Sequence, residues 1–473
     1  MRILSNVCLI LLLFIFRSHA VNVVLVMADD QGWGQTGYYN HPVLKTPNLD
    51  QMAKNGLRFD RFYSGGPVCS PTRATVLTGR THDRTGVLDH GYALRKQEKT
   101  LSEAMKKAGY ATAHFGKWHL NGLRGPGVPI LKNDTHGPGQ FGFEKWLSVT
   151  NFFDINPTMS RDGNFEEFSG DSSEIIVNEA LKFITEKSKL QVPFFAVVWY
   201  GTPHSPWMTL EKDRTPFKDL NEQSMHHYGE LVAMDRSIGT LRKGLRKLKI
   251  HEDTLIWFTS DNGGLPRINP STTGGLRNYK GSLYEGGIRV PAIIECPKLI
   301  RKPKITKYPA SASDIFPTIA KIVGLPESSM LKPQDGISLV PIFNKDLARR
   351  EEPIPFHSRG RSALIDNNLK IISFPKKGPK GIETFELYDL EKDHSESNNI
   401  AKTDPKTFTE MKSLLQNSNK SIEKSMAGKD YKEGTVNEGQ PKRQFWTEVD
   451  EYKEFFDQWR KRPEYKSRLK NIK

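Results

Sequence analysis

Short apolar segments alternate with amphipathic ones along most of the chain. Residues with helical spacing of their apolar positions predict four helices, at residues 46–56, 100–108, 173–187 and 223–247. Continuous apolar runs of strand length occur at residues 21–27 (VNVVLVM), 194–200 (FFAVVWY) and 254–259 (TLIWFT). Apolar strands that alternate with helices are typical of parallel strands covered on both faces. The pattern therefore predicts an α/β fold whose core is a large, doubly wound mixed sheet.

Two of these helices carry recognisable start signals. Thr46 is a candidate N-cap with Pro47 at the first helical position, and Gly56 marks the end of that helix. Thr100 and Glu103 have the spacing of a capping box, in which each side chain bonds to the backbone of the other residue. These signals predict helices that begin at residues 47 and 101.

The pattern of apolar segments changes in the last third of the chain. Residues 354–390 contain short apolar runs without intervening helices, which predicts a small antiparallel sheet beside the core. From about Glu433 the chain is polar and basic, and we interpret this part as a peripheral helix and a solvated tail. We therefore expect a signal peptide at residues 1–20 and a catalytic α/β domain at residues 21–345. Residues 346–473 would form a C-terminal subdomain with that sheet and a basic helical tail.

The first twenty residues have the features of a secretory signal peptide. Arg2 precedes an apolar run at residues 7–16, and Ser18-His19-Ala20 resembles a signal peptidase site. The apolar run is about half as long as the roughly 20 residues that span a bilayer, so we expect cleavage and no membrane anchor. The small number of cysteines favours a periplasmic or secreted protein over a lysosomal one.

Composition and charge narrow the function classes. With 37% hydrophobic and 26% charged residues, the chain is neither disordered nor collagen-like. A net charge of +15 favours polyanionic partners. For an exported protein these are sulfated or carboxylated polysaccharides and anionic envelope lipids rather than nucleic acid, and a basic surface without a partner is the alternative. After loss of the leader only Cys69 and Cys296 remain, and a disulfide between them is the structural alternative to a chemical role for Cys69.

Residues 67–79 (PVCSPTRATVLTG) carry the most specific motif. Cys69 precedes a helical run and Arg73 follows one turn later. Both the helix N-terminus and the guanidinium would stabilise negative charge beside residue 69. Taken alone, the motif predicts a thiolate or an anion site.

Acidic residues follow two of the apolar strands. Asp29 and Asp30 come directly after residues 21–27, whereas Asp261 and Asn262 follow residues 254–259. Oxygen ligands of this kind favour Ca²⁺ or Mg²⁺ over zinc. A pair of capping residues after a strand is the alternative for Asp29 and Asp30.

The Cys-x-Pro-x-Arg motif resembles the signature of type I sulfatases, the formylglycine-dependent branch of the alkaline phosphatase-like superfamily. Residues 109–119 (GYATAHFGKWH) look like the second signature of that family, GYxTxxxGKxH, although Phe115 stands where a small or aliphatic residue is more usual. Residues 202–206 and 277–287 look like its TPHxP and KxxxxEGG segments. The resemblance extends from Val21 to about Asp393.

This resemblance implies that a formylglycine-generating maturation enzyme oxidises Cys69 to an aldehyde. In the hydrated aldehyde one hydroxyl attacks sulfur, and deprotonation of the second expels sulfate, whereas a serine would retain a stable sulfate ester. By the same resemblance one divalent cation, Ca²⁺ rather than Mg²⁺, binds five ligands, namely Asp29, Asp30, modified Cys69, Asp261 and Asn262.

The resemblance also assigns the positively charged residues. Arg73 would orient the diol, Lys117 would contact the diol and the sulfate, and His119 would accept a proton when sulfate leaves. His204 and Lys280 would bind the ester and protonate the departing oxygen, and which of the two is the acid stays open. We interpret six further histidines as structural or surface residues, namely His82, His90, His114, His226, His227 and His251.

The expected function is hydrolysis of sulfate esters on a sulfated glycan. One rival is a phosphatase or phosphodiesterase of the same fold, which by resemblance would use Ser or Thr and two zinc ions. Another is an inactive glycan-binding paralogue, which would be expected to lack at least one residue of the catalytic set. A third is simple thiol chemistry at Cys69, which leaves the carboxylates unexplained.

Overall fold

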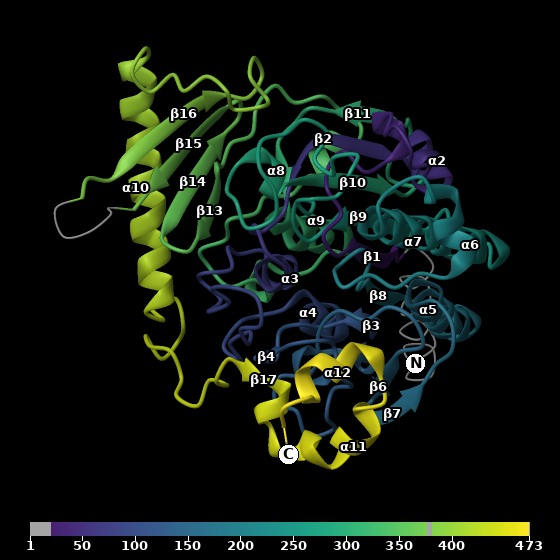
Figure 1. Ribbon diagram of the computed structural model, residues 1–473. Helices are drawn as coiled ribbons and strands as arrows, with labels where there is room; N and C mark the ends of the chain where they lie inside the picture. The colour runs from purple at the N-terminus through teal and green to yellow at the C-terminus, as the bar shows by residue number, and fades with distance from the viewer. Residues whose placement is uncertain (1–19, 376–380, 473) are drawn as a thin grey trace, which may run out of the picture.

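A large mixed sheet with helices on both faces forms the main body of the protein (Figure 1). The computed structural model describes residues 20–375 and 381–472, so the predicted signal peptide, apart from Ala20, lies outside the described residues. The strands run in the order β11-β2-β10-β9-β1-β8-β3-β5-β6-β7, and β12 pairs with β2. Their bounds are β1 (Asn22–Ala28), β2 (Leu57–Tyr63), β3 (Ala111–Lys117), β5 (Lys145–Val149), β6 (Thr158–Arg161), β7 (Asn164–Glu167), β8 (Phe194–Trp199), β9 (Thr254–Ser260), β10 (Arg289–Glu295), β11 (Lys304–Thr306) and β12 (Ala310–Ser311).

The centre of the sheet is parallel and buried on both faces. Strand β1 pairs in parallel with β8 and β9, and β3 continues the parallel order beyond β8. Val23 and Leu25 contribute to one hydrophobic core, whereas Val24 and Val26 contribute to the core on the opposite face, as the two-residue period of a strand requires. The three predicted apolar strands and the doubly wound α/β fold are confirmed.

Each of these two cores is closed by its own layer of helices. One face is covered by α3 (Cys69–Thr78), α4 (Leu101–Lys107) and α9 (Ile315–Val323). The other is covered by α2 (Pro47–Asn55), α5 (Ser172–Lys189) and α7 (Glu222–Lys247), and the short helix α6 (Glu211–Arg214) packs on α7. The short helix α8 (Glu285–Ile288) directly precedes β10, and its Ile288 packs with Ile354 and Phe356. The four helices expected from periodicity are present. The capping box is also present, because Thr100 Oγ1 accepts from the Glu103 amide and Glu103 Oε2 accepts from the Thr100 amide.

A separate antiparallel sheet confirms the expectation for residues 354–390. It contains β13 (Ile354–Ser358), β14 (Arg361–Asp366), β15 (Leu369–Phe374) and β16 (Thr384–Asp389), in that order. One face packs on α10 (Pro405–Met426) through Leu364, Ile371 and Met411. The domain boundary at residues 345 and 346 stays a prediction.

The C-terminal part of the chain returns to the main body instead of extending into solvent (Figure 1). Strand β17 (Gln444–Phe445) pairs in parallel with β4 (Leu123–Arg124), and helices α11 (Phe456–Trp459) and α12 (Pro463–Leu469) follow. Trp446, Trp459 and Tyr465 are buried in one aromatic cluster with core residues of the main body. The expectation of a solvated tail is therefore wrong, because these aromatic side chains pack the segment against the main body.

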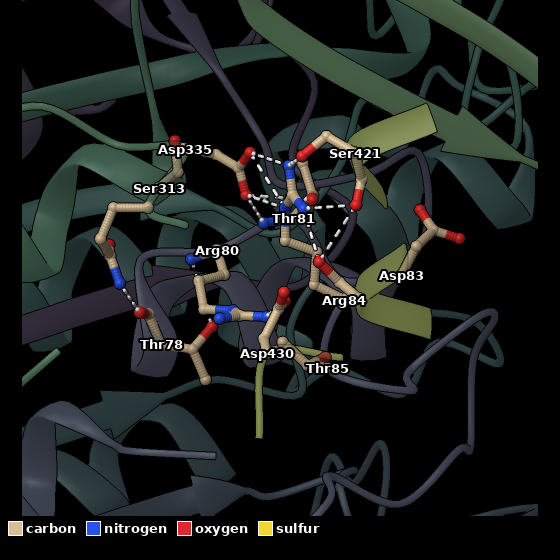
Figure 2. Close-up of polar contacts among 12 residues, drawn as sticks. Thr78, Arg80, Thr81, Asp83, Arg84, Thr85, Ser313, Asp335, Ser421 and Asp430 are labelled. Carbon is tan, nitrogen blue, oxygen red and sulfur yellow. Dashed lines mark hydrogen bonds and ion pairs between the residues drawn. The ribbon is translucent and has the colours of Figure 1, made fainter. Parts of the chain in front are cut away.

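Helix α10 and the segment that follows it are tied to the main body by two buried arginines that come after α3 (Figure 2). Arg84 pairs with Asp335 at 2.9 Å and donates to the hydroxyls of Ser421 and Ser425 on α10. Arg80 pairs with Asp430 at 2.6 Å. These contacts fix the segment after α3 against α10 and the residues that follow it.

We expect Arg84→Met to lower the free energy of unfolding by about 3 kcal/mol, because it leaves the Asp335 carboxylate buried without its cation. Urea denaturation followed by circular dichroism measures the loss. The control is Lys453→Ala, which breaks an exposed ion pair with Asp450 and should change stability by less than about 0.5 kcal/mol. Equal effects of the two substitutions would contradict this description of the Arg84 contacts.

No helix in the described ranges is long and apolar enough to cross a bilayer.

Candidate active site

Polar residues at the ends of four neighbouring strands meet at one edge of the main sheet. Asp29 and Asp30 follow β1, and Asp261 follows β9. Lys117 is the last residue of β3, and His204 follows β8 in the turn after the strand. These strands run in parallel, so their carboxyl ends lie on the same side, where α/β sheets bind ligands.

Cys69 is the first residue of α3 and lies over this edge. Its Sγ is 3.4 Å from Asp29 Oδ1, and the side chain is buried. Burial and the Asp29 charge raise the pKa of the Cys69 thiol. This shift disfavours the thiolate form of the unmodified side chain, whereas the alternative of an anion site at this position stays a prediction. Cys69 and Cys296 are both free, so the alternative of a disulfide between them is excluded.

The three cations of the site are each paired with a strand-end acid. Arg73 contacts Asp261 at 2.7 Å, and Lys117 contacts Asp29 at 2.5 Å. These four side chains have no exposed surface, and buried charges of this kind persist only when they are paired. Lys280 reaches in from a loop and lies 2.6 Å from Asp30 Oδ1. The arrangement brings three cations and three carboxylates together beside Cys69.

Glycine is required directly before Lys117. Gly116 has a φ of 105°, and a Cβ atom there would lie 2.0 Å from the carbonyl oxygen of Trp199 on β8. The Arg73 guanidinium donates to the Lys117 carbonyl at 2.9 Å and lies over the Trp199 ring. The glycine thus lets β3 approach β8 closely enough to aim Lys117 at Asp29.

One group of side chains could hold a metal ion. The ligand atoms of Asp29, Asp30, Cys69 and His204 all lie within 4.8 Å of one another. Asn262 Oδ1 is buried without a hydrogen-bond partner in the described part of the chain, while its amide donates to Asp30 at 2.7 Å. These oxygen donors fit a hard divalent cation.

This group differs in part from the ligand set expected from the sequence. His204 belongs to it, with Nε2 3.8 Å from Asp30 Oδ2. Asp261 is not part of this group. One of its carboxylate oxygens pairs with Arg73, and the other accepts from the Asp30 amide. Burial and the Asp29 charge raise the pKa of Asp261 to about 6.

Two histidines complete the site. The His204 ring stacks on Phe152 with centroids 4.6 Å apart, and Nδ1 lies 2.5 Å from the Ser205 carbonyl. His119 is buried in a left-handed backbone conformation with a φ of 56°, and neither ring nitrogen has a partner among the described residues. Burial and the Lys117 charge lower the pKa of His119. Backbone strain and unpartnered buried nitrogens are typical of functional sites.

A cavity of about 500 Å³ opens above these residues. Of the residues singled out in the sequence, Cys69, His119, His204 and Lys280 line it. His90 also lines it, although the sequence analysis interprets His90 as a structural or surface residue. Sequence reasoning missed further lining residues from distant loops and from the C-terminal segment, namely Arg124, Phe152, Arg359, Phe445 and Arg468.

Comparison with known proteins identifies the family. A protein-family model described as sulfatase matches residues 21–325. N-acetylgalactosamine-6-sulfatase of Canis lupus familiaris is 33% identical over 358 residues, which cover 68% of this chain and 65% of that relative. The match thus spans slightly less than two thirds of the curated relative.

Solved structures support the same fold. Ps i-CgsB, crystallised in complex with k-i-k-neocarrahexaose, has a TM-score of 0.74 at 23% identity and covers 96% of this chain and all of that one. BT4656, solved in complex with its substrate D-glucosamine-2-N,6-O-disulfate, has a TM-score of 0.70 at 20% identity and covers 85% of this chain and 98% of that one. With the family model matching more than half of its residues, the chain belongs to the sulfatase family.

Proposed function

We propose that the protein is a sulfuric ester hydrolase that removes sulfate from sulfated polysaccharides or oligosaccharides. The observation that carries the proposal is the convergence of Cys69, Arg73 and Lys117 with the strand-end acids beneath one open cavity. Fixed positive charges beside a nucleophile stabilise the charge that develops during transfer of an anionic group. Membership of the sulfatase family supports the same reaction.

In this proposal Cys69 is converted to formylglycine by a maturation enzyme. A hydrated aldehyde at this position would supply one hydroxyl for attack on sulfur and a second for release of sulfate. The raised pKa of the thiol supports conversion, since an unmodified Cys69 would be a neutral and weak nucleophile. Simple thiol chemistry is the less favoured alternative for that reason.

The strand-end acids would hold one divalent cation, Ca²⁺ in preference to Mg²⁺. Such an ion would supply Lewis acid stabilisation of charge on oxygen. The proposed ligands are Asp29, Asp30, residue 69, Asp261 and Asn262, and the position of His204 makes it an additional candidate. In the described part of the chain, a single group of three or more His, Cys, Asp and Glu side chains is close enough to hold a metal. A phosphatase with two zinc ions would need a second group.

The remaining side chains bind and orient the ester. Lys117 and Lys280 place ammonium groups beside Cys69 where sulfuryl oxygens can be held, and Arg73 keeps Asp261 oriented. Neither ring nitrogen of His119 has a partner among the described residues, and burial lowers its pKa and keeps the ring neutral, so a lone pair is available to accept a proton. All of these residues are present, which counts against an inactive glycan-binding paralogue.

The expected substrate is a sulfated glycan outside the cytoplasm. The net charge of +15 attracts polyanions. Two structural neighbours were solved with saccharides, one of them a disulfated glucosamine. Export to the periplasm or the extracellular medium remains part of the proposal.

Release of inorganic sulfate tests the proposed function. Protein produced together with a formylglycine-generating enzyme should release sulfate from members of a panel of defined sulfated saccharides, and should lose most activity and melt at a lower temperature after treatment with EDTA. Added Ca²⁺ should restore both properties. If the matured protein released sulfate from none of the substrates, the proposed function would be overturned. Full activity and an unchanged melting temperature in EDTA would overturn the proposed metal site.

A further inference from the structure

The C-terminal segment contributes one wall of the cavity above Cys69. Phe445 on β17 and Arg468 on α12 line the cavity together with Arg124 on β4. They are held there by β17, which pairs with β4, and by Tyr465, whose hydroxyl donates to the Gly127 carbonyl at 2.6 Å. The wall is thus a fixed part of the folded protein.

Two cations of this wall share one aromatic ring. The guanidinium carbon of Arg124 lies 4.4 Å from the centroid of Phe445, and that of Arg468 lies 4.5 Å from it. Stacking on a ring holds a guanidinium in place while its N–H groups remain available for an anion. Burial and the Arg124 charge lower the pKa of neighbouring Arg443, as expected where like charges lie close together.

Neither of these arginines is neutralised by an acid. Among the described residues, the side chains of Arg124 and Arg468 have no hydrogen-bond or ion-pair partner, and Arg124 Nε is buried without one. Other charges of the cavity are paired: Arg359 contacts Asp89 at 3.3 Å. Likewise, the acid of this wall, Glu464, is bound by Arg462 at 2.6 Å. The free positive charge of the cavity mouth is therefore concentrated on Arg124 and Arg468.

We propose that Arg124 and Arg468 form a second anion-binding subsite, which holds a sulfate or carboxylate group of the glycan other than the ester at Cys69. This inference rests on the proposed sulfatase function and narrows its substrate class to sugars with at least two anionic groups. Charge-assisted hydrogen bonds from guanidinium groups to such oxyanions are strong and directional. Phe445 acts as a positioning residue for both cations.

The test compares three substrates: a monosulfated monosaccharide, its disulfated counterpart, and a monosulfated disaccharide with a uronic acid carboxylate. We measure kcat/KM for each and take the ratio of doubly to singly charged substrate within each variant. That ratio is independent of the fraction of protein that is folded and matured. The wild type should prefer a doubly charged substrate. Arg124→Ala and Arg468→Ala should each reduce that preference by about tenfold, mainly through KM.

Arg301→Ala is the matched control, because Arg301 is an exposed arginine outside the cavity lining. It should keep the wild-type ratio, which excludes a general effect of net charge. A reduced preference for only the disulfated or only the carboxylated sugar identifies the anion that binds. Unchanged ratios in both variants, or no preference in the wild type, would overturn the subsite alone. Absence of turnover on every substrate would overturn the proposed function as well.

Discussion

Replacing Cys69 by alanine is expected to lower the rate of sulfate release by about 10⁴-fold or more, because it removes the group that becomes the nucleophile. The side chain is buried over Asp29 and makes no other hydrogen bond to the residues that the structure describes, so the fold should survive with a small loss of stability. Steady-state sulfate release and the melting temperature of the same preparation separate the two effects.

Cys296→Ala provides the matched control for this prediction. Cys296 is also a buried free cysteine, but it follows β10, where its Sγ contacts the Glu252 carbonyl. This substitution should leave kcat close to the wild-type value. Sulfate release by the Cys69→Ala protein at even a tenth of the wild-type rate would rule out residue 69 as the nucleophile.

The second large effect concerns protonation of the departing sugar oxygen. Nδ1 of His204 faces a carbonyl oxygen, which can only accept, so Nδ1 carries the proton and Nε2 presents a lone pair to the site. Burial and the Lys280 charge lower the pKa of His204, which keeps it neutral. Burial opposes the charged form of Lys280, but Asp30 outweighs it and raises the Lys280 pKa, so Lys280 carries the available proton.

We therefore expect Lys280→Met to slow hydrolysis of a sugar sulfate by about 10²- to 10⁴-fold. The loss should be much smaller with nitrophenyl sulfate, whose leaving group needs little protonation. His204→Gln should reduce the rate with both substrates by similar factors, since its role is to bind the ester. The reverse pattern, with the strong dependence on the leaving group in the His204 variant, would assign the acid to His204.

Most of the catalytic core could be predicted because its signals are local. The apolar runs that form β1, β8 and β9 are continuous, and the acids that follow them lie together because parallel strands end at one edge of the sheet. The capping box at Thr100 and Glu103 depends on residues three apart. The positions of such strands and caps can be predicted from the sequence because they depend on residues that are close together in the chain.

The C-terminal wall could not be predicted because it depends on contacts between distant parts of the chain. Trp446, Trp459 and Tyr465 stand among charged residues without a regular spacing, so their burial is visible only once the segment packs on residues 123–131. For the same reason the stacking of Phe152 on His204 had no sequence signal. The ion pair between Asp261 and Arg73 could not be predicted either. The sequence shows which acids lie together but not which cation each acid pairs with.

The central claim is that residue 69 is a formylglycine in the active enzyme. Trypsin should release residues 62–73 as one peptide, because it cleaves after Arg61 and after Arg73. In protein matured by a formylglycine-generating enzyme, we predict that this peptide is about 18 Da lighter than encoded, as exchange of a thiol for an aldehyde requires. A fully active preparation in which the peptide keeps its encoded mass and an alkylatable thiol would contradict the account.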